Sequence, residues 1–89
     1  MTDLRLSSPD TITVYGYDWC EDTTRARAHF DAAGVAYDYV NYEVDPAAKA
    51  LVHDAGYGST PVVITPQGTL FMEPSDEKLA GIVAAVSAG

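Results

Sequence analysis

Strand-like and helix-like segments alternate along this chain, and this alternation restricts its fold more than any other feature. Residues 11–16 are rich in β-branched and aromatic side chains, which predicts a strand. Residues 21–33 carry apolar side chains at helical spacing and stop at Gly34, which predicts a helix. A second strand is expected at residues 36–42. A strand, a helix and a strand in this order form a right-handed crossover, so the two strands are predicted to be parallel.

The rest of the chain predicts a helix, two short strands and a closing helix. Asp45 followed by Pro46 is a typical helix start, because the carboxylate caps free amides and proline needs no amide partner there. The tight turn at Gly68 predicts that the two strands beside it are antiparallel. The four elements are expected at residues 46–55, 60–65, 69–72 and 79–86.

The predicted fold class is therefore α/β, in the order β-α-β-α-β-β-α, with a mixed sheet of four strands covered by three helices. A chain of 89 residues supports one hydrophobic core, so residues 1–89 are expected to form a single domain with a loose N-terminus over residues 1–9. No apolar run approaches the ~20 residues that span a bilayer, and the first residues carry no signal-peptide core. We therefore expect a cytoplasmic protein.

The charge of the chain excludes two classes of partner. Thirteen acidic residues against five basic ones give a net charge of −8. Such a surface repels phosphate backbones and anionic membranes alike. The sequence therefore predicts neither a nucleic acid nor a membrane as a partner, and we expect a monomer.

Cys20 is the only cysteine of the chain and the predicted centre of its chemistry. A single cysteine forms no internal disulfide, so the thiol is free, bound to a metal, or catalytic. It lies between a predicted strand and a predicted helix, where free helix amides stabilise a thiolate. Trp19 offers an apolar wall for a small ligand beside it. The alternative is a small, buried and inert cysteine.

Several segments resemble the glutaredoxin branch of the thioredoxin superfamily, and within it the mycoredoxins, which work with mycothiol in place of glutathione. These segments and the order of the elements cover nearly the whole chain. The matching segments are Val14-Tyr15-Gly16-Tyr17-Asp18-Trp19-Cys20, Arg25-Ala26-Arg27, Asp45-Pro46-Ala47-Ala48, Thr60-Pro61-Val62-Val63, Gly68-Thr69-Leu70 and Pro74-Ser75-Asp76.

The resemblance implies a thioredoxin-like fold and roles for individual residues. Cys20 would be the attacking thiol, the Thr60-Pro61 bond would be cis, and the Thr60 backbone would pair with the peptide-like part of the ligand. Ser75 and Asp76 would face the ligand at the start of the last helix. Helix capping by Ser75, and an ordinary edge-strand start at Thr60, are the structural alternatives.

The sequence departs from the dithiol pattern C-x-x-C, because Thr23 stands where the second cysteine would be. Only monothiol chemistry remains, in which the thiolate attacks a mixed disulfide and is released by a second small-thiol molecule. Thr23 either hydrogen-bonds the Cys20 sulfur or is a plain solvent-facing residue. No permanently bound cofactor is expected, and mycothiol or glutathione would act as co-substrate.

Acidic residues crowd the cysteine and bear on the choice of small thiol. Asp18, Glu21 and Asp22 should raise the pKa of the thiol, whereas the helix amides and Arg25 should lower it. Glutathione carries two carboxylates, while mycothiol, a cysteinyl pseudo-disaccharide, carries none. A rim formed by these three residues and Asp76 therefore favours mycothiol.

Other candidate residues receive structural roles. His29 and His53 lack the spacing of a zinc site and are expected on helix surfaces, so no metal is predicted. An iron-sulfur cluster is not expected either, because Glu21 and Asp22 replace the small residues of the C-G-F-S motif. The tyrosines at positions 37, 39 and 42 suit a strand with one aromatic face packed against a helix.

The leading hypothesis is a glutaredoxin-like monothiol oxidoreductase that reduces mixed disulfides between a small thiol and protein substrates. Its alternative is a catalytically weak thioredoxin-fold module that binds a small thiol or a protein. The fraction of Cys20 present as thiolate near neutral pH separates the two.

Overall fold

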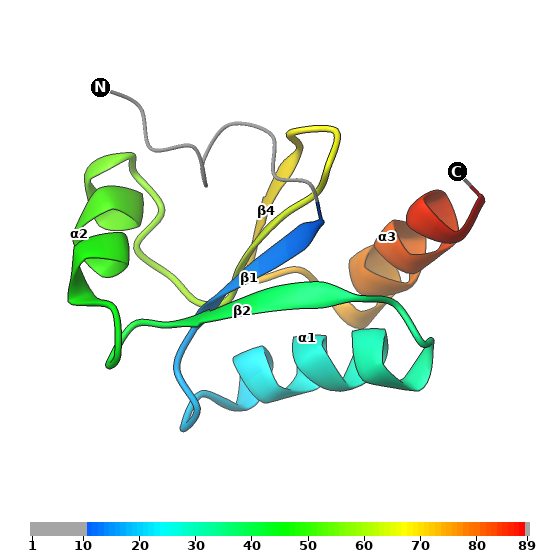
Figure 1. Cartoon of the computed structure of the whole chain (residues 1–89), viewed down its shortest axis with the longest axis horizontal. Coiled ribbons are helices and arrows are strands. Elements are labelled where there is room, and N and C mark those ends of the chain that lie inside the picture. Colours follow the sequence, from blue (N-terminus) through cyan, green and yellow to red (C-terminus); the bar gives the residue numbers. More distant parts are fainter. Residues whose placement is uncertain (1–10, 89) are drawn as a thin grey trace.

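The computed structural model describes residues 11–88, which form a four-stranded sheet with helices on both faces (Figure 1). The elements are β1 (Ile12–Gly16), α1 (Glu21–Ala32), β2 (Tyr37–Asn41), α2 (Pro46–Asp54), β3 (Val62–Ile64), β4 (Leu70–Met72) and α3 (Asp76–Ala88). The predicted order and fold class are confirmed. The loose terminus predicted for residues 1–9 lies outside the described residues. Within residues 11–88, every helix is too short or too polar to cross a membrane.

The strands lie in the order β2-β1-β3-β4, so β1 and β3 occupy the centre of the sheet. β1 pairs with β2 in parallel and β3 pairs with β4 in antiparallel, as the crossover and the turn at Gly68 predict. The structure adds that β1 pairs with β3 in antiparallel. Every residue of β1 and β3 is buried. A fully buried β1 therefore leads directly from the core to the turn that carries Cys20.

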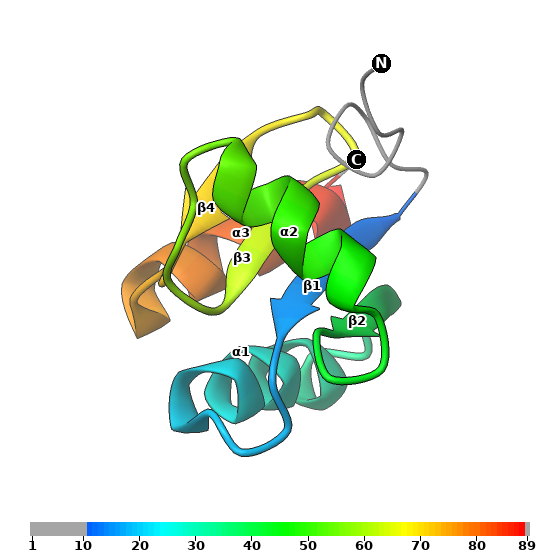
Figure 2. The ribbon, with the colours of Figure 1, turned by 90° about the vertical axis from the view of Figure 1, so that its left-hand side faces the viewer.

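Helices α1 and α2 lie on different sides of the sheet (Figure 2). Two apolar clusters fill the two interfaces between helices and sheet. On one face, Ala26 and Phe30 of α1 pack with Leu79 and Ile82 of α3 against Val63. The other cluster joins α2 to the opposite face, and its buried members are Tyr15, Tyr42, Ala48, Val52, Val62 and Ile64. The core thus fixes α1 against the sheet, and α1 begins immediately after the cysteine.

One packing prediction is wrong for Tyr42. Tyr37 and Tyr39 share the face of β2 that meets α1, and the Tyr37 ring lies 5.6 Å from that of Phe30. Tyr42 is buried in the cluster under α2, with its ring 6.3 Å from that of Tyr15. The reason is the strand period of two: positions 37 and 39 point to one face, and position 42 has the opposite parity.

Candidate active site

The turn after β1 brings Cys20 to the first turn of α1. The Cys20 N–H donates to the Tyr17 carbonyl at 3.1 Å, which closes a four-residue turn with Asp18 and Trp19 at its centre. Cys20 is the N-cap residue of α1 in an extended conformation, and its own carbonyl accepts from the Thr24 N–H at 3.0 Å. The thiol is free and partly buried. It therefore stands where the first helix amides have no helical carbonyl to bind.

The segment before β3 supplies the nearest partner of the sulfur. Thr60 Oγ1 donates to Cys20 Sγ at 3.3 Å, and Sγ lies 3.9 Å from the Thr60 carbonyl oxygen, although the residues are 40 positions apart. The Thr60-Pro61 bond is cis, as predicted. Pro61 is buried, and its carbonyl accepts from the Glu73 N–H at 2.8 Å, which anchors the segment to the end of β4.

Thr23 lies beneath the thiol and is fully buried, so the solvent-facing alternative is wrong. Its side chain packs on Gly16, where an added Cβ would overlap the Thr23 hydroxyl and methyl groups. Thr23 Oγ1 makes no hydrogen bond in the structure. Its proton is therefore free to turn toward the sulfur when the thiolate forms.

Opposing influences act on the pKa of the Cys20 thiol. Partial burial is the largest single influence and raises the pKa, because it disfavours the charged form. The hydroxyls of Thr23 and Thr60 and the backbone N–H groups of Thr23 and Asp22 favour the thiolate and together outweigh burial. The pKa of Cys20 therefore lies below its usual value. A hydrogen-bonded thiolate at a helix start is suited to nucleophilic attack on a disulfide.

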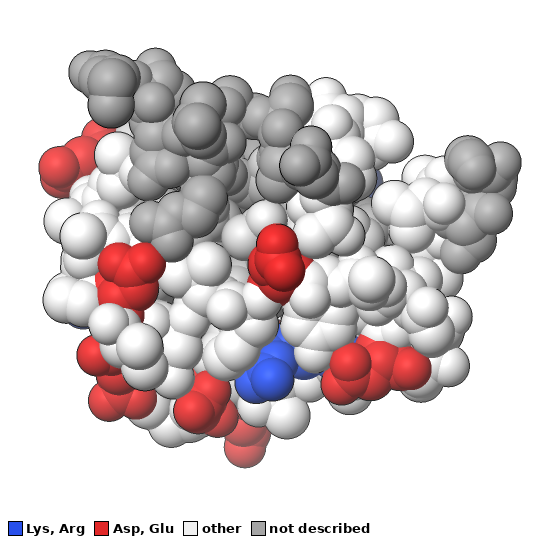
Figure 3. Space-filling model, in the orientation of Figure 1, with Lys and Arg blue, Asp and Glu red and all other residues white. Residues whose placement is uncertain are grey.

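Three acidic side chains near the cysteine, those of Asp18, Asp22 and Asp76, are paired with arginines on α1. The Arg25 guanidinium lies 3.2 Å from the Asp22 carboxylate and 3.0 Å from that of Asp76. Asp18 lies 3.7 Å from an Arg27 nitrogen. Figure 3 shows a basic patch in blue between β2 and α1, with acidic side chains in red around it. These pairs offset part of the negative charge that the sequence places around the thiol.

A glutaredoxin family model matches residues 12–68, more than half of the chain. The chain belongs to the glutaredoxin family. Among solved structures, the glutaredoxin grx-1 of Archaeoglobus fulgidus is similar with a TM-score of 0.72 and 20% identity, covering 93% of this chain and 96% of that one. Such identity shows the shared fold. The family match supports a glutaredoxin-like thiol oxidoreductase.

Two further structures share the fold of this glutaredoxin-family chain. A mutant of the thioredoxin-like protein BC3987 matches with a TM-score of 0.72 and 26% identity over 85% of this chain and 97% of its own. The glutaredoxin-like NrdH-redoxin of Escherichia coli, described as having a thioredoxin-like activity profile, matches with a TM-score of 0.65 and 21% identity. That match covers 70% of this chain and 80% of the NrdH-redoxin chain.

Ser75 and Asp76 make contacts within the helical layer. Ser75 Oγ accepts from the Lys78 N–H at 3.2 Å and so caps α3, which agrees with the capping alternative. Asp76 lies 3.1 Å from His29 Nε2 and also contacts Arg25, so it ties α3 to α1. The ligand role that the family implies for these two residues stays a prediction. His53 is exposed, and in residues 11–88 no three His, Cys, Asp or Glu side chains gather to hold a metal ion.

No role was assigned from the sequence to Tyr17 and Lys49, which lie at the turn that carries the thiol. The Tyr17 ring stacks on the Trp19 ring with centroids 4.5 Å apart, and Lys49 Nζ lies 5.5 Å from the Tyr17 centroid. Trp19 is 67% exposed, so its outer face is open to a ligand. The spacing of Tyr17 and Trp19 by two could not have indicated the stack, because both residues belong to a turn and not to a strand. No local sequence pattern indicates that Lys49 lies near Tyr17, because Lys49 belongs to α2 and is distant from Tyr17 in the sequence.

Proposed function

We propose that this chain is a monothiol thiol-disulfide oxidoreductase that reduces mixed disulfides between a small thiol and a protein. One observation carries the proposal: Cys20 Sγ accepts a hydrogen bond from Thr60 at 3.3 Å, at the start of a helix, where its pKa is lowered. The same sulfur is the only cysteine sulfur of the chain. The catalytic cycle therefore has to pass through Cys20 alone.

The cycle balances with one molecule of free small thiol consumed for each mixed disulfide reduced. The Cys20 thiolate attacks the small-thiol sulfur of the mixed disulfide, so that the protein thiolate leaves and takes a proton from water. A second small-thiol molecule, as its thiolate, then attacks the small-thiol sulfur bound to Cys20. This step releases the Cys20 thiolate and a small-thiol disulfide. The net reaction converts one mixed disulfide and one small thiol into one protein thiol and one small-thiol disulfide.

The residues around the sulfur have distinct roles in this proposal. The Thr60 hydroxyl and the α1 amides stabilise the Cys20 thiolate as attacking and leaving group, and Thr23 adds a third donor when the charge develops. The Thr60 backbone pairs with the peptide-like part of the small thiol. Trp19 covers one side of the bound thiol with an apolar surface.

Mycothiol is proposed as the preferred small thiol. The chain carries a net charge of −8, and Glu21 beside the sulfur is exposed, so the two carboxylates of glutathione meet repulsion that mycothiol avoids. The open face of Trp19 also suits the flat apolar face of a sugar ring. Lys49 favours glutathione instead, because its positive charge near Tyr17 attracts carboxylates.

The test uses one carrier peptide with a single cysteine, prepared as its mixed disulfide with mycothiol or with glutathione. We expect turnover of both substrates, with a higher kcat/KM for the mycothiol form. Turnover by Cys20→Ser at the wild-type rate would contradict the monothiol mechanism. Slow alkylation of Cys20 near neutral pH, together with no turnover of either substrate, would instead favour the binding-module alternative. Faster turnover of the glutathione form would contradict the preference alone.

A further inference from the structure

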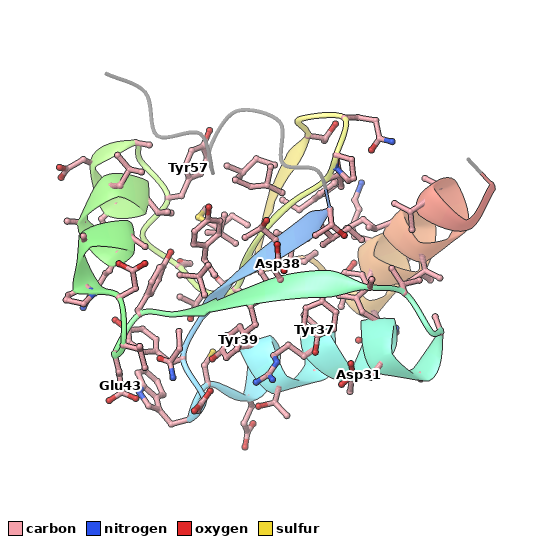
Figure 4. All side chains as sticks on the ribbon, in the orientation of Figure 1. Asp31, Tyr37, Asp38, Tyr39, Glu43 and Tyr57 are labelled. Atoms are coloured by element: carbon pink, nitrogen blue, oxygen red, sulfur yellow. The ribbon has the colours of Figure 1, made fainter. Side chains whose placement is uncertain are left out.

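A second cluster of side chains holds the turn before the thiol from the outer edge of the sheet. Tyr39 Oη donates to Asp18 Oδ1 at 2.8 Å, and the Arg27 guanidinium lies over the Tyr39 ring at 3.8 Å from its centroid. Arg27 also lies 3.7 Å from the same Asp18 oxygen. Figure 4 shows Tyr37 and Tyr39 pointing from β2 toward α1, and Asp38 pointing the other way. The cluster therefore joins β2, α1 and the turn.

Asp18 and Cys20 are directed to opposite sides of β1. Asp18 is held by Tyr39 of β2, whereas the Cys20 sulfur is held by Thr60 before β3. In the sheet, β2 and β3 flank β1 on opposite sides. Because Asp18 and Cys20 belong to the same four-residue turn, fixing one end of the turn limits where the other can point.

We propose that Tyr39 and Arg27 are positioning residues that hold the Asp18 carboxylate at the β2 edge, away from the Cys20 sulfur, and thereby keep the thiol reactive. The inference rests on the proposed thiol chemistry of Cys20. Neither residue contacts the sulfur in the structure, and both act through Asp18. Tyr39 is the main anchor, because a hydroxyl donating to a carboxylate at this distance forms a strong, charge-assisted bond. The Arg27 contact with Asp18 is longer and exposed, and such pairs hold weakly.

Burial around Tyr39 makes this hydroxyl a dependable donor. Burial, followed by the neighbouring Asp18 carboxylate, raises the pKa of Tyr39. Its hydroxyl therefore stays protonated at neutral pH. The other charged group at Asp18 is Arg27, which also contacts the Tyr37 hydroxyl from its Nε at 3.4 Å. The polar neighbours of the sulfur are the hydroxyls of Thr23 and Thr60 and the backbone N–H groups of Thr23 and Asp22, and the charged Glu21 and Asp22 follow Cys20 directly in α1.

Removing the Tyr39 hydroxyl frees the Asp18 carboxylate to turn with its loop. A carboxylate that moves closer to the sulfur raises the thiol pKa, since like charge opposes the thiolate. An exposed charge at this range shifts a pKa by a few tenths of a unit to about one unit. The rate of alkylation near neutral pH then falls by about two- to ten-fold, because the thiolate fraction falls with it.

The experiment compares Tyr39→Phe with Tyr37→Phe as a matched control. Both changes remove one phenolic hydroxyl from the same face of β2, but the Tyr37 hydroxyl contacts Arg27 and not Asp18. Thiolate absorbance is followed against pH, and the rate of alkylation by iodoacetamide is measured at low salt. We expect Tyr39→Phe to raise the Cys20 pKa and slow alkylation, while Tyr37→Phe leaves both near the wild-type values.

The Asp18→Asn background decides whether the effect passes through the carboxylate. Asparagine keeps an acceptor for Tyr39 but carries no charge, so Tyr39→Phe should leave the Cys20 pKa unchanged in that background. A wild-type thiol titration in Tyr39→Phe, or equal shifts in both Phe variants, would overturn the proposal. Turnover of mixed disulfides by the wild type is measured separately. If the wild type shows no turnover but Tyr39→Phe still raises the Cys20 pKa, the proposed function is contradicted and the positioning role is supported.

Discussion

Thr23 connects the chemistry of the sulfur to the packing of the sheet. It is fully buried, it packs on Gly16, and its hydroxyl has no partner in the structure. A buried hydroxyl without a partner costs free energy, on the order of 1–3 kcal/mol. Such a group is explained if it serves the thiolate, whose negative charge recruits the free donor.

Replacing Thr23 by valine should therefore weaken the nucleophile without disturbing the core. Valine has nearly the shape of threonine and lacks the hydroxyl, so the pKa of Cys20 should rise toward its usual value. The pH profile of alkylation should move to higher pH, and turnover at neutral pH should fall about two- to ten-fold, corresponding to less than about one pKa unit. Thr24→Val, on the exposed side of α1, is the matched control. An unshifted profile in Thr23→Val would show that Thr23 is only a packing residue.

Glu21 and Asp22 are expected to differ in their effect on the thiol, although both stand in the first turn of α1. Asp22 is paired with Arg25 at 3.2 Å, so its charge is partly offset, whereas Glu21 is exposed. Removing a carboxylate lowers the thiol pKa because it removes like charge. We expect Glu21→Gln to lower the Cys20 pKa by a few tenths of a unit at low salt, and Asp22→Asn to lower it less. Thiolate absorbance measures both, and the reverse order would contradict this assignment of charges.

At the scale of the elements, the start of α3 depends on a residue that the sequence also assigns to ligand binding. Ser75 Oγ accepts from the Lys78 N–H, which satisfies one of the free amides of the helix start. Ser75→Ala should lower the free energy of unfolding by about 1 kcal/mol, while Ser75→Asp should retain the cap. Chemical denaturation measures both variants. A KM for the small-thiol disulfide that stays at the wild-type value in both would limit Ser75 to capping.

Local signals predicted most of the elements. Asp45 accepts from the Ala48 N–H at 3.1 Å, as the Asp-Pro pair indicates, and the crossover and the turn at Gly68 predict the parallel β1–β2 pair and the antiparallel β3–β4 pair. The apolar spacing of α3 begins only at Leu79, because its first three residues are charged, and the start of the helix at Ser75 and Asp76 came from capping and from the family resemblance. Capping and charge, rather than apolar spacing, mark that end of the helix.

The candidate site was harder to predict, because its contacts join distant parts of the chain. Sequence position alone indicated a reactive Cys20, since a strand followed by a helix puts it at a helix start. The approach of Thr60, 40 residues away, came only from resemblance to a family. The bond from Tyr39 to Asp18 was missed because both residues had been given other roles, one in packing and one in the acidic rim.

Over the whole molecule, exposed apolar side chains gather at the end of the sheet that carries the thiol. Among the described side chains, the large exposed apolar residues are Trp19, Val44 and Met72. They follow β1, follow β2 and end β4, three strands that run in the same direction. All three therefore lie at the same end of the sheet as Cys20. This arrangement suits a site that meets a protein substrate as well as a small thiol.

Charge should then decide which protein substrates react fastest. Carboxylates stand next to the exposed apolar side chains, with Asp18 before Trp19 and Glu43 before Val44, and the chain carries a net charge of −8. A peptide with basic residues around its cysteine should therefore have a lower KM than an acidic peptide of the same length and apolar content. The difference should be several-fold at low salt and should shrink at high salt, because ions screen exposed charges beyond about 10 Å.

Three synthetic peptides with basic, neutral or acidic flanks, each a mixed disulfide with the same small thiol, test this expectation. kcat/KM is measured at low and high ionic strength, and a small uncharged disulfide is the control for salt effects on the chemistry itself. If charge selects the substrate, kcat/KM at low salt decreases from the basic to the neutral to the acidic peptide. Added salt then lowers kcat/KM for the basic peptide and raises it for the acidic one. If the acidic peptide reacts as fast as the basic one at low salt, the negative surface has no part in substrate choice. The exposed apolar side chains around Cys20 would then have to select substrates by shape alone.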